Sequence, residues 1–399
     1  MTTAALHDVT FDEALAQTRA LALHLPAEPV ALEDLVGRVL AEDVLARGDH
    51  PAFTNSAMDG YALRAGDAAA GEVLQLVGES RAGAPFAPAL AAGEAVRIST
   101  GAELPEGADA ILRLEDAAEE AGGVRALAAP AAGAFVRHRG EDVRLGQVLL
   151  FAGQVVGPHE VAVVAGAGHA RVPCTRRPRV AVLGSGDEVV PAGEELGPGQ
   201  IYDANRPGVA AQAEAAGARV VARAVVPDDL QATIATVGGI LDGHDAPAPD
   251  LLVTTGGVSV GRHDHLRPAL EACGVREVLY GVEIRPGHPL WLGRRGEQLV
   301  LGLPGNPVSA AVCFHAFGRP LLGRGDSWER RMPMAERYAK GTPRTELVRC
   351  VEVDGALRPL PRQGSHAITS LAGATHLAVI DAARREVVAG EQVRTARLV

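Results

Sequence analysis

The chain has 399 residues, enough for roughly two to four domains with substantial cores, and its 47 % hydrophobic content argues against disorder. A net charge of -11 and an aromatic content of 3 % disfavour a broad nucleic-acid surface, which usually carries basic excess and stacking rings. We therefore expect no nucleic-acid partner, while one local anion pocket is compatible with the acidic chain.

The first residues and the cysteines bear on the compartment. The start, MTTAALHDVTFDEA, lacks the basic residues and apolar run of a secretory signal, and no apolar run reaches the ~18 residues of a membrane span. The four cysteines are far apart and form no CxxC pair, so zinc and thioredoxin-like sites have weak support. We expect a cytoplasmic protein with no membrane partner.

Residues 10–25 predict a helix, because Thr10 is followed three positions later by Glu13, the spacing of a capping box. Residues 32–45 predict a second helix. The stretch AFTNSAMDGYAL (52–63) is polar and rich in turn formers, and Asp59 offers an acceptor from this loop. The alternative for this stretch is a surface turn in which Asp59-Gly60 closes a hairpin.

Residues 71–127 alternate short apolar runs with Gly and Pro, which is typical of a small β-rich domain. Within them, Thr100 either lines a cleft or satisfies a turn. The motif RHRGED (137–142), which ends at Asp142, suits either a solvated turn or an anion site. We predict a β-rich insert at 51–138, flanked by the two parts of a split, helix-containing domain at 1–50 and 139–175.

From residue 180 onward, predicted strands alternate with predicted helices. The strands are expected at 180–183, 219–226, 251–255 and 298–301, and the helices at 205–216, 228–241, 264–273 and 306–322. This order predicts a doubly wound α/β module at 176–325, with a parallel sheet covered on both faces. Residues 326–399 predict a separate small β domain, so the predicted fold class is α/β multidomain.

Three loops of the module follow strand ends and are expected to converge on one crevice: 184–188, 255–264 and 303–309. They place Glu188 and Asp264 there, and carboxylate oxygens are ligands that Mg²⁺ prefers. Asp228 lies just before a predicted helix, so capping that helix is its alternative role.

Further stretches predict an anion site. In LPGNPVSA (303–310), Pro304 brings the backbone close to a ligand, Asn306 suits an N-cap, and Ser309 lies in a first helical turn that presents free N–H groups. In EIRPGHPLWLG (283–293), Arg285 and His288 are two potential cations on a rigid turn. The alternatives are a well-capped helix and exposed loop charges. The polar loop at 363–370 could reach a neighbouring crevice.

Taken together, these stretches resemble the molybdopterin molybdenumtransferase family, which includes the C-terminal domain of gephyrin. The motifs NSAMDGYA, GGVSVG and GLPGNPVSA are highly specific as a set, although each is weak alone. The matching pieces cover nearly the whole chain in the family's order: NSAMDGYA (55–62), STGA and PEGADAI (99–111), RGED (139–142), SGDE (185–188), TTGGVSVGRHD (254–264), RPGHP (285–289), GLPGNPVSA (302–310) and QGSH (363–366).

The resemblance implies four domains and a homodimer whose site lies at the subunit interface. The implied substrates are adenylylated molybdopterin and molybdate, and AMP is released as molybdate is inserted at the dithiolene sulfurs. Glu188, Asp228 and Asp264 would organise Mg²⁺ and the attacking water. Asp59, Thr100 and Asp142 would complete the catalytic site across the interface. The implied substrate-binding residues are Arg285, His288, Pro304, Asn306, Ser309 and Ser365.

One residue departs from the family, which usually has lysine where this chain has His288. Because histidine is only partly charged near neutral pH, we expect molybdate binding to weaken above about pH 7. Two other functions stay open: a molybdopterin adenylyltransferase, which the α/β module alone resembles, and a non-catalytic scaffold or cofactor-carrier paralogue. Molybdopterin adenylyltransferase and molybdoenzymes are possible partners.

Overall fold

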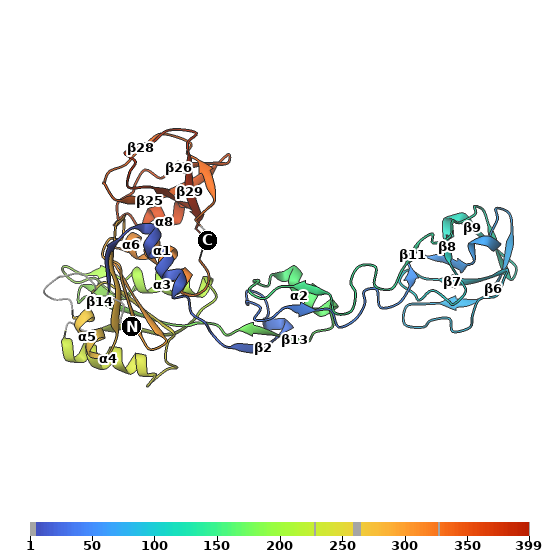
Figure 1. Cartoon of the computed structure of the whole chain (residues 1–399), viewed down its shortest axis with the longest axis horizontal. Helices are drawn as coiled ribbons and strands as arrows, with labels where there is room; N and C mark the ends of the chain where they lie inside the picture. Colours follow the sequence, from blue (N-terminus) through green and yellow to red (C-terminus); the bar gives the residue numbers. More distant parts are fainter. Residues whose placement is uncertain (1–4, 227–228, 258–264, 326–327, 399) are drawn as a thin grey trace. The chain divides into compact units, whose positions relative to one another are not determined.

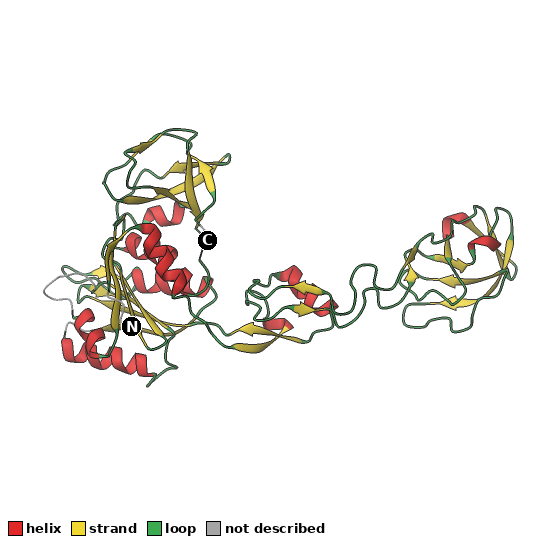
Figure 2. Ribbon diagram, in the orientation of Figure 1, coloured by secondary structure: helices red, strands yellow, loops and turns green. Residues whose placement is uncertain are grey.

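The structure is a computed structural model that describes residues 5–226, 229–257, 265–325 and 328–398. It divides into a small unit, Ala27–Thr175, and a large unit, Met1–Pro26 together with Arg176–Val399. Each unit is described by itself, with the element labels of Figure 1, and Figure 2 distinguishes helices from strands. Among the described residues, no helix is both long and apolar enough to cross a membrane.

The large unit is built on a seven-stranded sheet. All neighbouring strands run parallel except β21, which is antiparallel to the strand on either side. The predicted parallel module is confirmed for β14, β17, β18 and β22, whereas β1, β19 and β21 are additional to it. In sheet order the strands are β1 (Leu6–Val9), β19 (Arg276–Val282), β21 (Trp291–Arg295), β22 (Gln298–Leu303), β18 (Leu251–Thr255), β14 (Arg179–Ser185) and β17 (Arg219–Val226).

Helices cover both faces of this sheet. Alternate side chains of a strand point to opposite faces, so they enter two different cores. Val180 and Val182 of β14 lie in one core, while Ala181 and Leu183 lie in the other. The first core includes residues of α1 (Phe11–Ala20), α3 (Asn205–Ala215) and α6 (Pro307–Cys313), which is followed by η4 (Phe314–Gly318) and α7 (Arg319–Leu321). The second includes residues of α4 (Leu230–Asp242) and α5 (Leu266–Ala272).

The first 26 residues belong to the large unit, whereas residues 1–50 were expected in the split domain. Leu6 of β1 pairs with Leu279 of β19, and Phe11 packs edge-on against Trp328 with ring centroids 5.2 Å apart. The physical reason is that β1 finds its hydrogen-bond partner at β19, and the apolar side chains of α1 are buried in the core of the large unit. The capping box is confirmed, since the Thr10 backbone N–H donates to Glu13 Oε2 at 2.8 Å.

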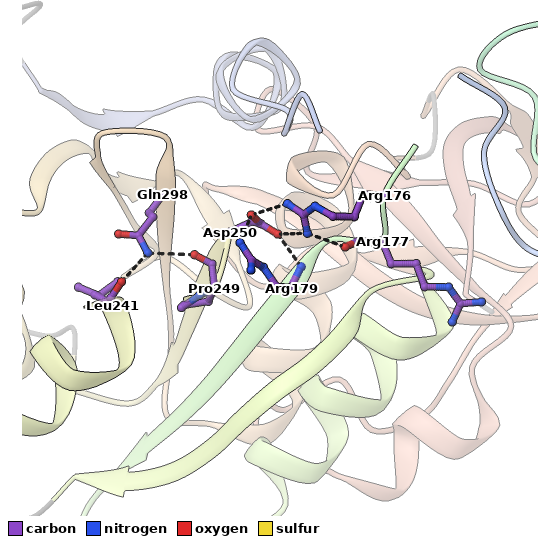
Figure 3. Close-up of polar contacts among 7 residues, drawn as sticks. All are labelled: Arg176, Arg177, Arg179, Leu241, Pro249, Asp250 and Gln298. Carbon is purple, nitrogen blue, oxygen red and sulfur yellow. Dashed lines mark hydrogen bonds and ion pairs between the residues drawn. The ribbon is translucent and has the colours of Figure 1, made fainter. Parts of the chain in front are cut away.

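The linker into the module is anchored at the amino ends of the strands (Figure 3). Arg176 donates from Nη2 to Asp250 Oδ1 at 2.9 Å and from Nη1 to Oδ2 at 3.0 Å, and the Arg179 N–H donates to Oδ2 at 2.7 Å. Burial opposes ionisation of Asp250, but these hydrogen bonds outweigh burial and hold its pKa below the usual range. The contacts hold β14 beside β18 at the amino ends of the strands, whereas the predicted site lies at their carboxyl ends.

Residues 27–50 and 139–175 of the small unit share one hydrophobic core, which includes Val30, Leu40 and Val164. The helix predicted at 32–45 is wrong. Only η1 (Leu32–Asp34) is helical there, because Gly37 has φ +78° and the chain then forms single bridges to distant strands. The elements are β2 (Ala27–Ala31) paired with β13 (Arg171–Thr175), β3 (Val44–Leu45) paired with β12 (Val148–Leu150), and α2 (Pro158–Gly166).

A six-stranded sheet holds the other cores of the small unit. Asp59-Gly60 does not close a hairpin, since β4 (Asn55–Ser56) pairs with β11 (Val136–Arg137). Gly60 begins β5 (Gly60–Leu63), which pairs with β8 (Ala110–Arg113). A Cβ on Gly60 would lie 2.1 Å from the Leu112 carbonyl oxygen, so only glycine allows β5 to pair with β8 here. In order the strands are β8 (Ala110–Arg113), β5 (Gly60–Leu63), β7 (Glu94–Ile98), β6 (Val73–Ser80), β10 (Gly123–Ala126) and β9 (Ala117–Glu120), with η2 (Ala65–Asp67) and η3 (Leu114–Asp116) between them in the chain.

The C-terminal strands form a second sheet of the large unit, and the α/β module contributes a strand to it. Ile284 and Arg285 of β20 (Ile284–Arg285) pair with Thr345 and Glu346 of β25 (Thr345–Val353). This pairing ties the turn after Arg285 to the C-terminal part of the chain. The sheet continues with β27 (His376–Ile380), β29 (Gln392–Arg397), β23 (Arg331–Pro333) and β26 (Ala356–Pro359); nearby elements are α8 (Thr369–Gly373), and β24 (Tyr338–Ala339) paired with β28 (Glu386–Val387).

Candidate functional site

Three loops meet where β14, β18 and β22 end. Gly256 and Gly257 have φ +79° and +68°, a conformation that favours glycine. A Cβ on Gly257 would lie 2.8 Å from Ser185 Oγ and 2.3 Å from Leu266 Cδ1, and a Cβ on Gly305 would lie 3.7 Å from Gly256 Cα. The predicted convergence of the three loops is therefore confirmed.

Polar atoms without partners lie at these strand ends. Asn205 donates from Nδ2 to the Gly305 carbonyl at 2.6 Å, while its Oδ1 is buried and has no hydrogen-bond partner among the described residues. The Thr254 hydroxyl is likewise buried and unpartnered within the described part of the chain. Buried polar groups are normally hydrogen-bonded, so these two atoms mark a region where the described residues leave polar groups unsatisfied.

The predicted carboxylates are only partly described. Glu188 is exposed and follows Gly186, whose φ of +121° lets its backbone pass close to the Glu188 carboxylate. Of the predicted trio, Asp228 and Asp264 lie outside the described residues. The cap of α4 is Asp229, whose Oδ1 accepts from the Ala232 N–H at 2.8 Å.

A cavity of about 420 Å³ opens between the end of β22, the turn after β20 and the C-terminal loop. All six predicted substrate-binding residues line it, although they come from three separate stretches of the sequence. Four more polar residues, Thr342, Arg344, Gln363 and His366, line it with them. We call this cavity the anion pocket. Its predicted lining residues are Arg285, His288, Pro304, Asn306, Ser309 and Ser365.

The wall of the anion pocket beside α6 follows from local chain geometry. Asn306 occupies the N-cap position and Pro307 the first helical position, as predicted, but the Asn306 side chain makes no capping hydrogen bond. The Val308 N–H donates to the Ser365 carbonyl at 3.2 Å, which joins the C-terminal loop to the helix start. Ser309 is buried in the same turn, so its hydroxyl is held close to this junction.

Arg285 faces the anion pocket with a carboxylate beside it. Its Nη1 lies 3.3 Å from Glu346 Oε1, and the Glu346 side chain is only 4 % exposed. Tyr338 donates its hydroxyl to Glu346 Oε2 at 2.8 Å. Burial, and then this hydrogen bond, raise the pKa of Tyr338 well above its usual range. Part of the Arg285 charge is therefore balanced inside the protein.

His288 contacts two carboxylates. Its Nε2 lies 3.1 Å from Asp8 Oδ1 and 3.3 Å from Glu283 Oε1. Arg344 approaches the same Glu283 from the other side, with Nε 3.1 Å from Oε2. Asp8, Glu283 and His288 are residue types that can bind metals, and their ligand atoms all lie within 4.8 Å of one another. An anion at His288 must therefore compete with carboxylates.

Three predicted residues, Asp59, Thr100 and Asp142, lie in the small unit. Asp59 Oδ1 accepts from the Thr100 N–H at 2.7 Å and from the Thr100 hydroxyl at 3.0 Å, and these bonds, the backbone one first, lower the pKa of Asp59. Thr100 thus holds the Asp59 carboxylate ionised. Asp142 is exposed, and its N–H donates to the His50 carbonyl at 3.1 Å.

Comparison with known proteins identifies the family. The chain is 36 % identical to a molybdopterin molybdenumtransferase of Synechococcus elongatus over 390 residues, which cover 94 % of this chain and 96 % of the relative. The chain belongs to the molybdopterin molybdenumtransferase family. Another family member, from Haemophilus influenzae, is 34 % identical over 383 residues, 92 % of either chain. The enzymatic nature and the multidomain α/β fold class predicted above are thereby supported.

Domain models and solved structures agree with this membership of the molybdopterin molybdenumtransferases. The MoeA N-terminal region (domain I and II) matches residues 9–168, the probable molybdopterin binding domain 181–324, and the MoeA C-terminal region (domain IV) 331–398. A crystal structure of a molybdopterin biosynthesis MoeA protein from Pyrococcus horikoshii is 26 % identical with a TM-score of 0.82, covering 98 % of this chain and 100 % of that one. The predicted fold class is confirmed, and the adenylyltransferase alternative is not favoured.

Several polar residues at the site of this molybdopterin molybdenumtransferase were not predicted. Arg344 and Thr342 line the anion pocket, and Asn205 reaches the strand-end loops from α3. Asp203 accepts from the backbone N–H groups of Asn205 and Arg206, each at 3.0 Å. The sequence signal was DANR just before a predicted helix, the position where a strand-end loop delivers polar groups.

Proposed function

We propose that this chain inserts molybdate into adenylylated molybdopterin and releases AMP, forming molybdenum cofactor. The anion pocket is the observation that carries the proposal, because it gathers hydroxyls and guanidinium groups from four separate stretches of the sequence beside the strand-end loops. The relatives that bear this activity in their name extend over nearly the whole chain. Both supports concern the same region, since the loop containing Pro304 and Asn306 belongs to the pocket and to the strand ends.

In this proposal the anion pocket binds molybdate. Ser309 and Ser365 offer hydroxyl donors, while Arg285 and Arg344 offer charge-assisted ones, which suit an oxyanion better than neutral donors. The strand-end crevice takes the pterin nucleotide, as open α/β sheets bind ligands beyond strand carboxyl ends. Glu188 would orient water for attack on the phosphoanhydride and accept its proton.

Mg²⁺ is part of the same proposal. The donors at the strand ends are hard oxygens: the exposed Glu188 carboxylate, the unpartnered Asn205 Oδ1 and, from the family resemblance, Asp228 and Asp264. Such a donor set fits Mg²⁺, which prefers oxygen ligands and keeps several waters. A bound Mg²⁺ would supply charge neutralisation for the phosphate oxygens as AMP leaves.

We further propose a homodimer in which Asp59, Thr100 and Asp142 of one subunit complete the site of the other. The support is that polar loops of the small unit match the family's motifs, yet lie far in sequence from the anion pocket. A cytoplasmic location and an exchange of substrate or product with molybdopterin adenylyltransferase and molybdoenzymes belong to this proposal. The four cysteines are free thiols, which suits a reducing compartment.

The experiment supplies purified protein with adenylylated molybdopterin, molybdate and Mg²⁺ and measures AMP. The wild type should release AMP, and Glu188→Gln should lower the rate by about a hundredfold. No AMP from the wild type would favour the scaffold alternative. Pyrophosphate release from ATP and molybdopterin would favour the adenylyltransferase alternative.

A further inference from the structure

Arg349 of β25 is a charged side chain enclosed completely in the C-terminal part of the chain. Its exposed fraction is 0 %, and it lies within a run of buried residues in the strand. Among the described residues no carboxylate forms an ion pair with its guanidinium, and its Nη1 has no hydrogen-bond partner. Burying an uncompensated charge is costly, so an ordinary core position would not favour arginine.

The hydrogen bonds that this guanidinium donates all go to residues 362–370. Nε donates to Ser370 Oγ at 2.8 Å, and Nη2 donates to the carbonyl oxygens of Arg362 and Gly364 at 3.1 and 3.3 Å. Gln363 closes the arrangement by donating from Nε2 to the Arg349 carbonyl at 2.8 Å and accepting from its N–H at 3.0 Å. Five hydrogen bonds therefore tie residues 362–370 to a single position of β25.

The same loop forms a wall of the anion pocket. Ser365 follows Gly364 directly and accepts at its carbonyl from the Val308 N–H at 3.2 Å, next to Ser309. The chain of contacts thus runs from Arg349 through Gly364 and Ser365 to the start of α6. Burial lowers the pKa of Arg349, and the positive charge of Arg285 acts in the same direction.

We propose that Arg349 is a positioning residue for molybdate: it holds Ser365 on the pocket wall, and its unbalanced charge favours an anion there. Arg285 and Arg344 each contact a carboxylate, whereas Arg349 has none among the described residues. Its charge is therefore the one that is not cancelled locally. The inference rests on the proposed function, because it assumes that molybdate occupies the anion pocket.

The test measures equilibrium binding of molybdate alone to the purified full chain, by dialysis and metal analysis. Arg349→Met keeps an unbranched side chain but removes the charge and every donor, and should raise the Kd about tenfold. Arg349→Lys keeps a charge but loses the planar fork, and should raise the Kd about threefold. Val348→Ala is the matched control, since Val348 is a buried neighbour in β25 that lies in a separate hydrophobic core. Its Kd should stay within about twofold of the wild type.

Two further readouts separate positioning from general destabilisation. At saturating molybdate the kcat of Arg349→Met should stay within about threefold of the wild type, so the loss appears in KM. Hydrogen exchange of the 363–368 amides should be faster in both Arg349 variants and unchanged in Val348→Ala. If Arg349→Met does not fold, Arg349→Lys decides alone by the same readouts.

The outcomes distinguish the two proposals. A wild type that releases AMP and binds molybdate, with Arg349 variants that bind it as tightly as Val348→Ala does, overturns the role of Arg349 and leaves the function standing. A wild type that binds no molybdate removes the assignment of the anion pocket, and the role of Arg349 with it.

Discussion

Three positively charged or titratable side chains of the anion pocket, Arg285, His288 and Arg344, each lie beside a carboxylate that offsets positive charge. Arg285 contacts Glu346, while His288 and Arg344 share Glu283. A pocket lined in this way holds an oxyanion less tightly than its arginine content suggests, because each carboxylate repels the ligand. It also releases the ligand more easily, which suits a site whose anion must move on to the pterin.

Removing one of these carboxylates should strengthen anion binding. Glu283→Gln keeps the side-chain length but removes the carboxylate that Arg344 contacts and one of the two that His288 contacts. We therefore expect molybdate to bind about threefold to tenfold more tightly at low salt. The gain should shrink as ionic strength rises, because salt screens charges on a partly exposed surface. Glu297→Gln is a control of equal charge change, since the Glu297 side chain is exposed and pairs with Arg294. Equal affinity of Glu283→Gln and wild type would show that the carboxylate does not face the ligand.

The pair of Asp59 and Thr100 allows a prediction about pH. Hydrogen bonds from Thr100 lower the pKa of Asp59 in the folded chain. The resulting stabilisation is complete above the unfolded-state pKa and is lost as the pH falls through the lower folded-state pKa. Thr100→Ala keeps the backbone bond but loses the hydroxyl bond, so the Asp59 pKa should rise part of the way to its usual value. A carboxyl-detected NMR titration measures it, and Thr100→Ser should leave the pKa unchanged.

At the scale of elements, the three strand-end loops are packed against each other through glycine. A Cβ at Gly257 would collide with Leu266 and Ser185 at 2.3 and 2.8 Å, and its positive φ strains any other residue. We expect Gly257→Ala to destabilise the large unit by about 1–3 kcal/mol and to lower AMP release, because the loops must separate.

Gly305→Ala provides the matched control in the same crevice. Its Cβ would meet only Gly256 Cα at 3.7 Å, an ordinary contact, so stability should change by less than about 0.5 kcal/mol. The fluorescence of Trp291 and Trp328, both buried in the large unit, reports unfolding of this part of the chain. Equal stability of the two variants would show that the loops adjust without strain.

How far the sequence predicts these elements depends on whether their signals are local. The capping box of Thr10 and Glu13 and the loops that follow β14, β18 and β22 are local signals, and their prediction is confirmed. The pairing of β1 with β19 and the antiparallel β21 depend on distant partners, so no window of sequence shows them. Residues 32–45 have helical composition, yet Gly37 and bridges to Val155 and Cys174 prevent a helix.

The candidate site was predicted in part. The six pocket residues follow from motifs of a known family, and the structure brings them to one cavity. Arg349 and Arg344 were missed, because an arginine inside an apolar strand and another beside a proline match no motif. The structure places Arg344 in the pocket lining, and the enclosure of Arg349 is the observation from which its role is proposed.

At the scale of the whole molecule, the predicted catalytic residues are divided between the two units. Asp59 and Thr100 lie in the small unit, while Glu188 and the anion pocket lie in the large one. The proposed homodimer resolves this division by forming each site from two subunits. A mixture of two inactive variants should then regain activity.

We expect an equal mixture of Asp59→Asn and Glu188→Gln chains, unfolded and refolded together, to release AMP at about one quarter of the wild-type rate. Half of the dimers would contain one variant of each kind, and one of their two sites would carry both native residues. Either variant refolded alone should stay inactive. Absence of recovery from a mixture shown to contain mixed dimers would place Asp59 and Glu188 in the same subunit's site.

The short strand β20 leaves the α/β module and completes the edge of the C-terminal sheet. Because Arg285 lies in this strand, the two parts of the large unit share one piece of backbone at the mouth of the pocket. Moving them apart at this point would break the pairing of Ile284 and Arg285 with Thr345 and Glu346, so we expect the two parts to move together around the pocket. A chain shortened at residue 325 would lose Thr342, Arg344 and Ser365, and with them the C-terminal wall of the anion pocket.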